Sequence, residues 1–147
     1  MRKFFFLGWV LLLVAGVGCE KHYIQVTKAP ITEESLASVF AKTPDPRQLS
    51  PPYGEELVVQ WNLPVAARSK KLFLELTMIY RDYSEETLRC AIEDIRGVFS
   101  YFLLGADYEV KKGILTSKVD IVTEEGEILK QWHHRLWVSL IHKELEE

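Results

Sequence analysis

The sequence predicts a mainly β protein, an antiparallel sandwich of two sheets preceded by a signal peptide, a short helix and a proline-rich tether. Three observations lead to this prediction. From Glu55 onward, short segments alternate apolar and polar residues, which is the pattern of half-buried strands. Turn sequences, several with glycine, separate these segments. Aromatic residues make up 12% of the 147-residue chain and charged residues 27%, which is typical of a packed domain rather than a disordered chain.

The first 18 residues have the features of an export signal. Two basic residues follow the first methionine, and residues 4–17 form an apolar run that is too short for an ordinary membrane span but matches a secretory signal. The stretch Gly16-Val17-Gly18-Cys19 resembles the lipobox of bacterial lipoproteins, with glycine at position 16 where that family favours leucine. The resemblance implies cleavage before Cys19, which then carries lipid. The alternatives are a plain signal peptide with a coincidental cysteine and an uncleaved anchor.

The charge and the cysteine count exclude several classes of function. The full chain has a net charge of −3, and no block rich in lysine and arginine suggests nucleic-acid binding. The only cysteines are Cys19 and Cys90. If Cys19 carries lipid, Cys90 has no partner within the chain, which excludes an internal disulfide and a four-cysteine zinc site. We expect Cys90 to pack as a small apolar residue, with pairing between chains as the alternative, and we predict no cofactor.

Residues 19–54 are predicted to form a lipidated tether that carries one short helix. Residues 20–31 show no clear period. Thr32 can cap a helix over residues 33–42, and the following prolines end it. A helix this short is not stable alone in water, so it must dock on the domain, a partner or the bilayer surface. Its apolar face consists of Leu36, Val39 and Phe40. The proline-rich segment 43–54 cannot form a helix or a central strand, so it is expected to be an extended spacer.

The sandwich domain is expected over residues 55–141, followed by a charged tail over residues 142–147. The segments assigned as strands are 57–63, 72–81, 98–104, 115–121 and 128–140. The compact apolar segment 98–104 is expected to be covered on both sides. The last two segments form the strongest hairpin, with a tight turn at Glu125-Gly126. Residues 85–95 fit either a strand or a helix capped by Ser84, and the neighbouring strands favour a strand.

Six or seven short strands with these turn signals are typical of an immunoglobulin-like or fibronectin-like sandwich. The lack of an internal disulfide favours the fibronectin-like form. Residues 44–64 (PDPRQLSPPYGEELVVQWNLP) and 126–141 (GEILKQWHHRLWVSLI) are similar to small lipoproteins of chlamydia-type bacteria. This resemblance implies an envelope with an outer membrane, and it brings no activity and no catalytic residues with it.

No group of residues predicts catalysis, so the candidate site is an interface. Neighbouring side chains of a strand point to opposite faces, so His133 and His134 cannot easily bind one metal ion. By this parity, His134 lies on the core side with Trp132. Trp137 then shares the outer face with His133 and Arg135, and tryptophan and arginine are enriched at binding hot spots. The alternative is that Trp137 lies on a second buried face, beneath the proline-rich segment or the short helix.

These observations predict a membrane-anchored lipoprotein of the bacterial cell envelope that binds an envelope protein or has a structural role, without catalytic activity. Lipid on Cys19 would hold the domain at a membrane, where even weak contacts become effective because tethering raises the local concentration. The alternative is an envelope enzyme or small-ligand carrier with a cleft near His133 and Trp137. A deep pocket with convergent polar groups would favour that alternative.

Overall fold

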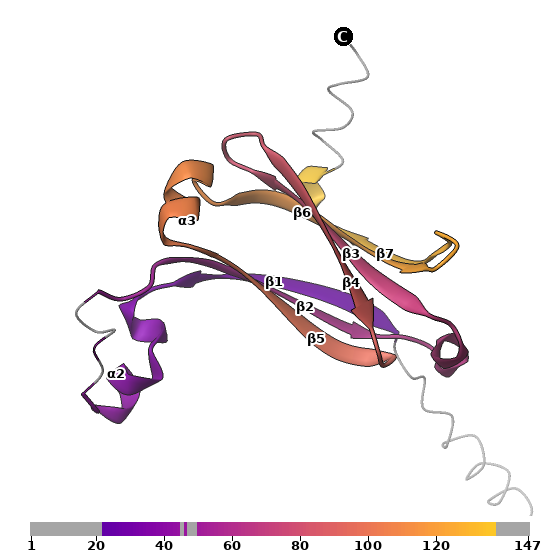
Figure 1. Cartoon of the computed structure of the whole chain (residues 1–147), viewed down its shortest axis with the longest axis horizontal. Coiled ribbons are helices and arrows are strands. Elements are labelled where there is room, and N and C mark those ends of the chain that lie inside the picture. The colour runs from indigo at the N-terminus through magenta and orange to yellow at the C-terminus, as the bar shows by residue number, and fades with distance from the viewer. Residues whose placement is uncertain (1–21, 45, 47–49, 138–147) are drawn as a thin grey trace, which may run out of the picture.

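The computed structural model describes residues 22–44, 46 and 50–137, and within this part of the chain seven strands form two antiparallel sheets packed face to face (Figure 1). The predicted β-sandwich is therefore confirmed. The strands are β1 Tyr23–Ile31, β2 Gly54–Asn62, β3 Leu72–Tyr80, β4 Glu85–Ile92, β5 Arg96–Leu104, β6 Ile114–Thr123 and β7 Ile128–His133. The strand orders are β1-β2-β5 and β4-β3-β6-β7. In a constant-type immunoglobulin domain the fourth strand joins the first sheet. Here it pairs with β3, which is the fibronectin-like arrangement.

Strand β1 corrects the prediction that residues 20–31 belong to a tether. Tyr23–Ile31 pairs with β2 along its whole length, and Ile24 is buried in the core. Lys28 shares strand parity with the buried Ile24, but its side chain is still 39% exposed. Its Nζ donates to the Ile114 carbonyl at 2.9 Å and lies 3.6 Å from a Glu55 carboxylate oxygen. The folded domain therefore begins at Tyr23 and not at the second strand.

The predicted helix over residues 33–42 is present only as two short pieces. A 3₁₀ turn, η1 Glu33–Ser35, precedes α2 Ala37–Ala41, and Leu36 between them is extended. The amide of Thr32 donates to Ser35 Oγ at 3.1 Å, so Thr32 does stand at the helical start. Leu36 is buried, but it is not part of the core cluster of the sandwich, and the contacts of this segment are mainly between its two helical pieces. The described part of the proline-rich spacer contains no strand before Gly54.

The segment that fits both strand and helix forms strand β4, at the edge of its sheet beside β3. Thr87 Oγ1 donates to Thr77 Oγ1 at 3.2 Å across the pair, and the Arg89 guanidinium lies 4.5 Å from the centroid of the Phe73 ring. Cross-strand contacts of this kind stabilise a strand pair, which is why the strand prevails over the helix. Cys90, on the same strand, is a free thiol that is half-buried rather than fully buried.

The apolar sequence of β5 predicts a strand covered on both sides. This prediction is wrong, because only one face of β5 is covered. Leu103 faces the core and is buried, whereas Val98 and Phe102 point outward and are exposed. The three-stranded sheet has no further layer over these side chains within the described part of the chain. The helix α3 Gly105–Lys111 follows β5 and lies at one end of the sandwich (Figure 1).

A partly buried polar network around Tyr80 joins the two sheets at the end near α3. The Tyr80 hydroxyl, on a side chain that is 0% exposed, donates to Glu86 at 2.7 Å and lies 2.8 Å from the Tyr101 hydroxyl. Lys111 of α3 donates to the same Glu86 oxygen at 2.6 Å. Burial, followed by the hydrogen bonds to Tyr101 and Glu86, raises the pKa of Tyr80. The hydrogen bonds from Lys111 and then Tyr80 lower the pKa of Glu86, so this carboxylate stays ionised.

Candidate functional site

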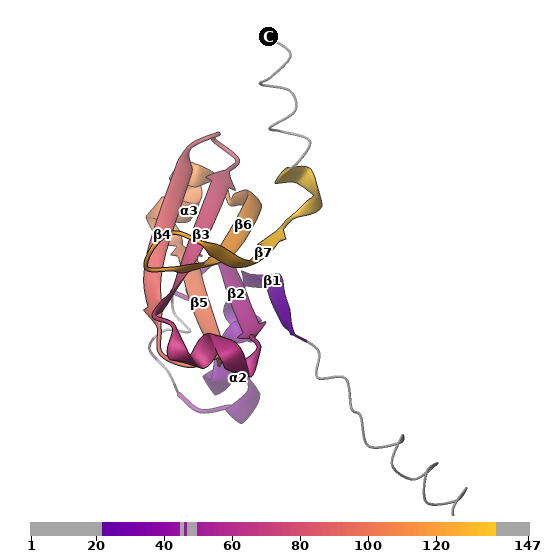
Figure 2. The same ribbon diagram turned by 90° about the vertical axis from the view of Figure 1, so that its right-hand side faces the viewer.

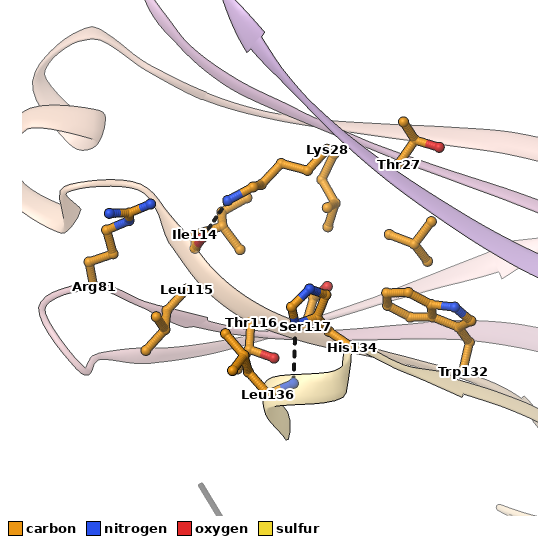
Figure 3. A pocket seen from close by; sticks show the side chains of 12 residues that line it. Thr27, Lys28, Arg81, Ile114, Leu115, Thr116, Ser117, Trp132, His134 and Leu136 are labelled. Atoms are coloured by element: carbon orange, nitrogen blue, oxygen red, sulfur yellow. Dashed lines mark hydrogen bonds between the residues drawn. The ribbon is translucent and has the colours of Figure 1, made fainter. Parts of the chain in front are cut away.

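A cleft of about 550 Å³ opens on the side of the sandwich between β1 and the β6–β7 hairpin (Figure 3). We refer to it as the edge cleft. It is lined by Val26–Lys28 of β1, Ile114–Ser117 of β6, Leu57, Arg81, Trp132, His134 and Leu136. Both sheets therefore contribute to its walls, and segments far apart in the sequence meet in it.

The edge cleft exists because β7 is shorter than the sequence pattern predicts. The alternation indicates a strand through Leu140, but β7 ends at His133, and residues 135–137 form a helical turn. His134 starts this turn, since its Nδ1 accepts a hydrogen bond from the Leu136 amide at 3.3 Å. Strand β7 therefore pairs with only the second half of β6 and leaves the first half beside an open space.

The walls of the cleft are mainly apolar, with basic groups among them. Figure 3 shows Arg81 and Trp132 at opposite ends of the cleft, with Lys28 between them. The Lys28 ammonium already has Glu55 and the Ile114 carbonyl as partners. Arg81 is exposed, and its side chain makes no hydrogen bond or ion pair with another described residue. Arg81 is therefore the basic group available to a bound molecule.

One buried polar atom in the cleft wall also lacks a partner. Thr116 is almost fully buried, and its Oγ1 makes no hydrogen bond within the described part of the chain. An unmet buried hydroxyl costs about 1–3 kcal/mol, and because this one has almost no accessible surface, a molecule in the cleft would reach it only if the wall rearranged. Figure 3 places Thr116 close to Leu136 at the rim. Counting only partners among the described residues, the cleft thus offers apolar contact and the uncompensated cation of Arg81.

The structure separates the residues predicted to form an interface. His133 and Arg135 are exposed, whereas Trp137 is buried, with the Lys118 ammonium 5.8 Å from its ring. The predicted common face is wrong because the strand ends at His133, so strand parity does not extend to Trp137. Trp137 is buried, as the alternative interpretation expects, but its contact is with Lys118 of β6, and nothing in the described part of the chain places the proline-rich segment or the short helix over it. His133 and Arg135 stay interface candidates by exposure alone.

The sequence also predicts that Trp132 and His134 face the core, and this holds for Trp132 only. Trp132 packs against the core as expected and also lines the edge cleft. His134 was expected on the core side, but it is exposed at the cleft rim because it follows the end of β7. Within the described residues, no three His, Cys, Asp or Glu side chains are grouped so that they could bind a metal ion. Cys19 and the tail over residues 142–147 lie outside the described residues.

Sequence reasoning missed Lys28, Arg81 and Thr116 as cleft residues. They lie on β1, after β3 and on β6, and only the pairing of the strands brings them together. No spacing within one segment signals this arrangement. A comparison with protein-family models and with curated proteins finds no match for the chain. No helix in the described ranges is long and apolar enough to cross a membrane.

Proposed function

We propose that the protein is a lipoprotein of the bacterial cell envelope, anchored through Cys19, whose sandwich binds a protein partner in the edge cleft. The observation that carries the proposal is the cleft itself. It has an open apolar wall with Trp132 and Leu136 and an Arg81 side chain that pairs with no other described residue, and among residues 134–137 no strand continues β7. Aromatic and arginine side chains are enriched at binding hot spots, and the apolar wall supplies the surface to be buried on binding.

The chemistry of the cleft specifies the kind of segment that fits. Apolar side chains of the partner would contact Trp132 and Leu136, and an acidic group would pair with Arg81. Lys28 adds little net attraction because Glu55 already compensates its charge. Anchoring both proteins to the same envelope layer raises their effective concentration, so a contact of modest area is sufficient. The role is recognition, and no catalytic step is assigned to these residues.

Site-specific photo-crosslinking tests the proposal. A photoreactive amino acid is placed at Leu136, which lines the cleft and is 46% exposed, in the full-length protein in its native membranes. The matched control is Leu104, which is 37% exposed on the outer face of the other sheet. We expect a discrete protein adduct at Leu136 that Arg81→Glu strongly reduces, and none at Leu104. Equal labelling at both positions, or no adduct at Leu136, would contradict the proposal.

A small-ligand carrier is the second candidate, and the size of the cleft favours it. Its volume of about 550 Å³ falls within the range of roughly 300–1,000 Å³ that is usual for small-molecule pockets. Native mass spectrometry of gently extracted protein separates the two functions. A stoichiometric small-molecule adduct that Leu136→Arg abolishes would favour the carrier. An unoccupied protein that still forms the Leu136 crosslink would favour the protein-binding module.

A further inference from the structure

The start of β1 defines one end of the sandwich, which we name the anchor end. It contains Tyr23, the 3₁₀ turn η3 Val65–Ser69, the β4–β5 turn at 93–95 and the β6–β7 turn at 124–127. In Figure 1 this end lies on the right, and Figure 2 views it from the front. The helices α2 and α3 lie at the opposite end (Figure 1). The two ends are therefore distinguishable by their distance from the N-terminal segment.

The distance between the lipid site and the folded domain is short. Cys19 precedes Tyr23 by four positions, and a fully extended chain spans at most about 3.3–3.6 Å per residue, or roughly 14 Å in total. A tether over residues 19–54 would have allowed the domain to move far from the bilayer and to rotate. Because Tyr23 is already paired in the sheet, lipid on Cys19 confines the domain to a narrow layer.

We propose that the anchor end lies against the lipid headgroups of the membrane that holds Cys19, with Val65 as its apolar contact. This inference rests on the proposed lipid anchor and adds the orientation of the domain. Val65 is 63% exposed on η3. Beside it, a hollow of about 310 Å³ is lined by apolar residues such as Leu63, Ala67 and Leu129, and it includes His22, the first described residue. His22, three positions after Cys19 in the sequence, thus lies at an apolar surface of the domain.

The charges at and around the anchor end are balanced, which decides what kind of membrane contact it can make. The turns of the anchor end contain one basic side chain, Arg68, and five acidic ones, Glu93, Asp94, Glu124, Glu125 and Glu127. Four further basic residues lie within three positions of these turns, Lys70, Lys71, Arg96 and Lys130, and bring the wider surface to five charges of each sign. Several are paired with one another, as Lys71 is with Glu124 at 2.7 Å. The surface has no net charge to repel or to select headgroups, so the contact needs neither anionic lipids nor low salt.

This orientation places the edge cleft close to the membrane. Its β1 residues, Val26–Lys28, lie three to five positions from Tyr23, or about 10–17 Å along a strand that rises about 3.3 Å per residue. Together with the reach of the link, the cleft lies within roughly 30 Å of the bilayer surface. The segment that occupies the cleft must then be membrane-proximal, for example the juxtamembrane part of another anchored protein.

Fluorescence quenching of lipidated full-length protein in phosphatidylcholine vesicles tests the orientation. A fluorophore is attached through Val65→Cys or through Val110→Cys, both in a Cys90→Ala background that leaves a single reactive thiol. The two valines are matched, because Val110 is 69% exposed on α3 at the opposite end. Lipids with a nitroxide on the headgroup act as the quencher. Flotation of the vesicles reports, independently, whether the protein is anchored.

We expect the label at position 65 to be quenched severalfold more than the label at position 110, with little change in high salt. Equal quenching, or stronger quenching at position 110, in protein that floats with the vesicles would overturn the orientation and leave the lipid anchor standing. Protein that does not float would overturn the anchor and the orientation together. Quenching that disappears in high salt would show that electrostatics, and not the short link, holds the surface, and would also overturn the inference.

Discussion

The network around Tyr80 is the polar feature that should contribute most to the stability of the sandwich, and Tyr80→Phe tests it. The substitution removes one hydroxyl and leaves the ring in place. That hydroxyl is hydrogen-bonded to Glu86 of β4 and to Tyr101 of β5, and Tyr80 itself is 0% exposed. Water therefore cannot replace it without rearrangement. Glu86 keeps Lys111 as a partner, so the carboxylate is weakened but not left alone.

The expected magnitude follows from the two bonds that are lost. A hydrogen bond to a charged group contributes about 1.5–3 kcal/mol and one between neutral groups about 0.5–1.5 kcal/mol. Because the pairs share one network, their contributions are not additive. We expect Tyr80→Phe to lower the free energy of unfolding by about 2–3 kcal/mol. For a domain of this size that corresponds to a fall in the melting temperature of about 8–12 °C.

Urea unfolding of the mature domain, followed by circular dichroism, measures the effect. Tyr83→Phe is the control, because Tyr83 is exposed and its hydroxyl makes no hydrogen bond with a described residue. Tyr101→Phe and the double variant complete a mutant cycle, which should give a coupling free energy above about 0.5 kcal/mol. Unfolding midpoints of Tyr80→Phe and the wild type that coincide would refute the reasoning that this network joins the sheets.

Two further predictions concern the same sandwich. Gly97→Ala should lower the free energy of unfolding by about 1–3 kcal/mol, because the new Cβ would lie 2.3 Å from Trp61 Cζ2 and overpack the core. The control is Ser100→Ala on the outer face of β5, which should have little effect. Equal urea midpoints for the two variants would contradict this prediction. Glu86→Gln should flatten the acid side of the stability profile. The folded pKa of Glu86 is lowered, so its stabilisation is present above its unfolded pKa and is lost as the pH falls through the folded pKa. Parallel acid limbs for Glu86→Gln and the wild type, in urea titrations at a series of pH values, would show that this carboxylate makes no pH-dependent contribution.

The strands with regular alternation could be predicted from the sequence, because one face of each is buried by the other sheet. In β3, Leu74, Leu76 and Met78 are all fully buried on one side, so period and environment agree. β1 escaped detection because Lys28 and Pro30 interrupt its inward face. Lys28 is accommodated there because its side chain reaches solvent and contacts Glu55 and the Ile114 carbonyl, partners that lie far away in the sequence.

The two errors at the surface have a different physical origin. The apolar run of β5 predicts cover on both faces, yet Phe102 is exposed, because an apolar sequence does not determine whether a second layer packs over that face. The alternation after His133 continues in the sequence as Leu136 and Val138, although the backbone turns into a helix at residue 135. The Leu136 amide donates a local hydrogen bond to His134 Nδ1 instead of pairing with β6. Strand β7 therefore ends at His133, which leaves the edge cleft open.

The most direct test of the central claim is the intact mass of the protein extracted from native bacterial membranes, measured beside a Cys19→Ala variant. The proposed lipid anchor predicts loss of residues 1–18 and an added mass of acyl groups on Cys19, with neither change in the variant. An unlipidated chain cut near Cys19 would contradict the account. The domain would then be a soluble exported sandwich, and both the tethering and the membrane-facing anchor end would be withdrawn.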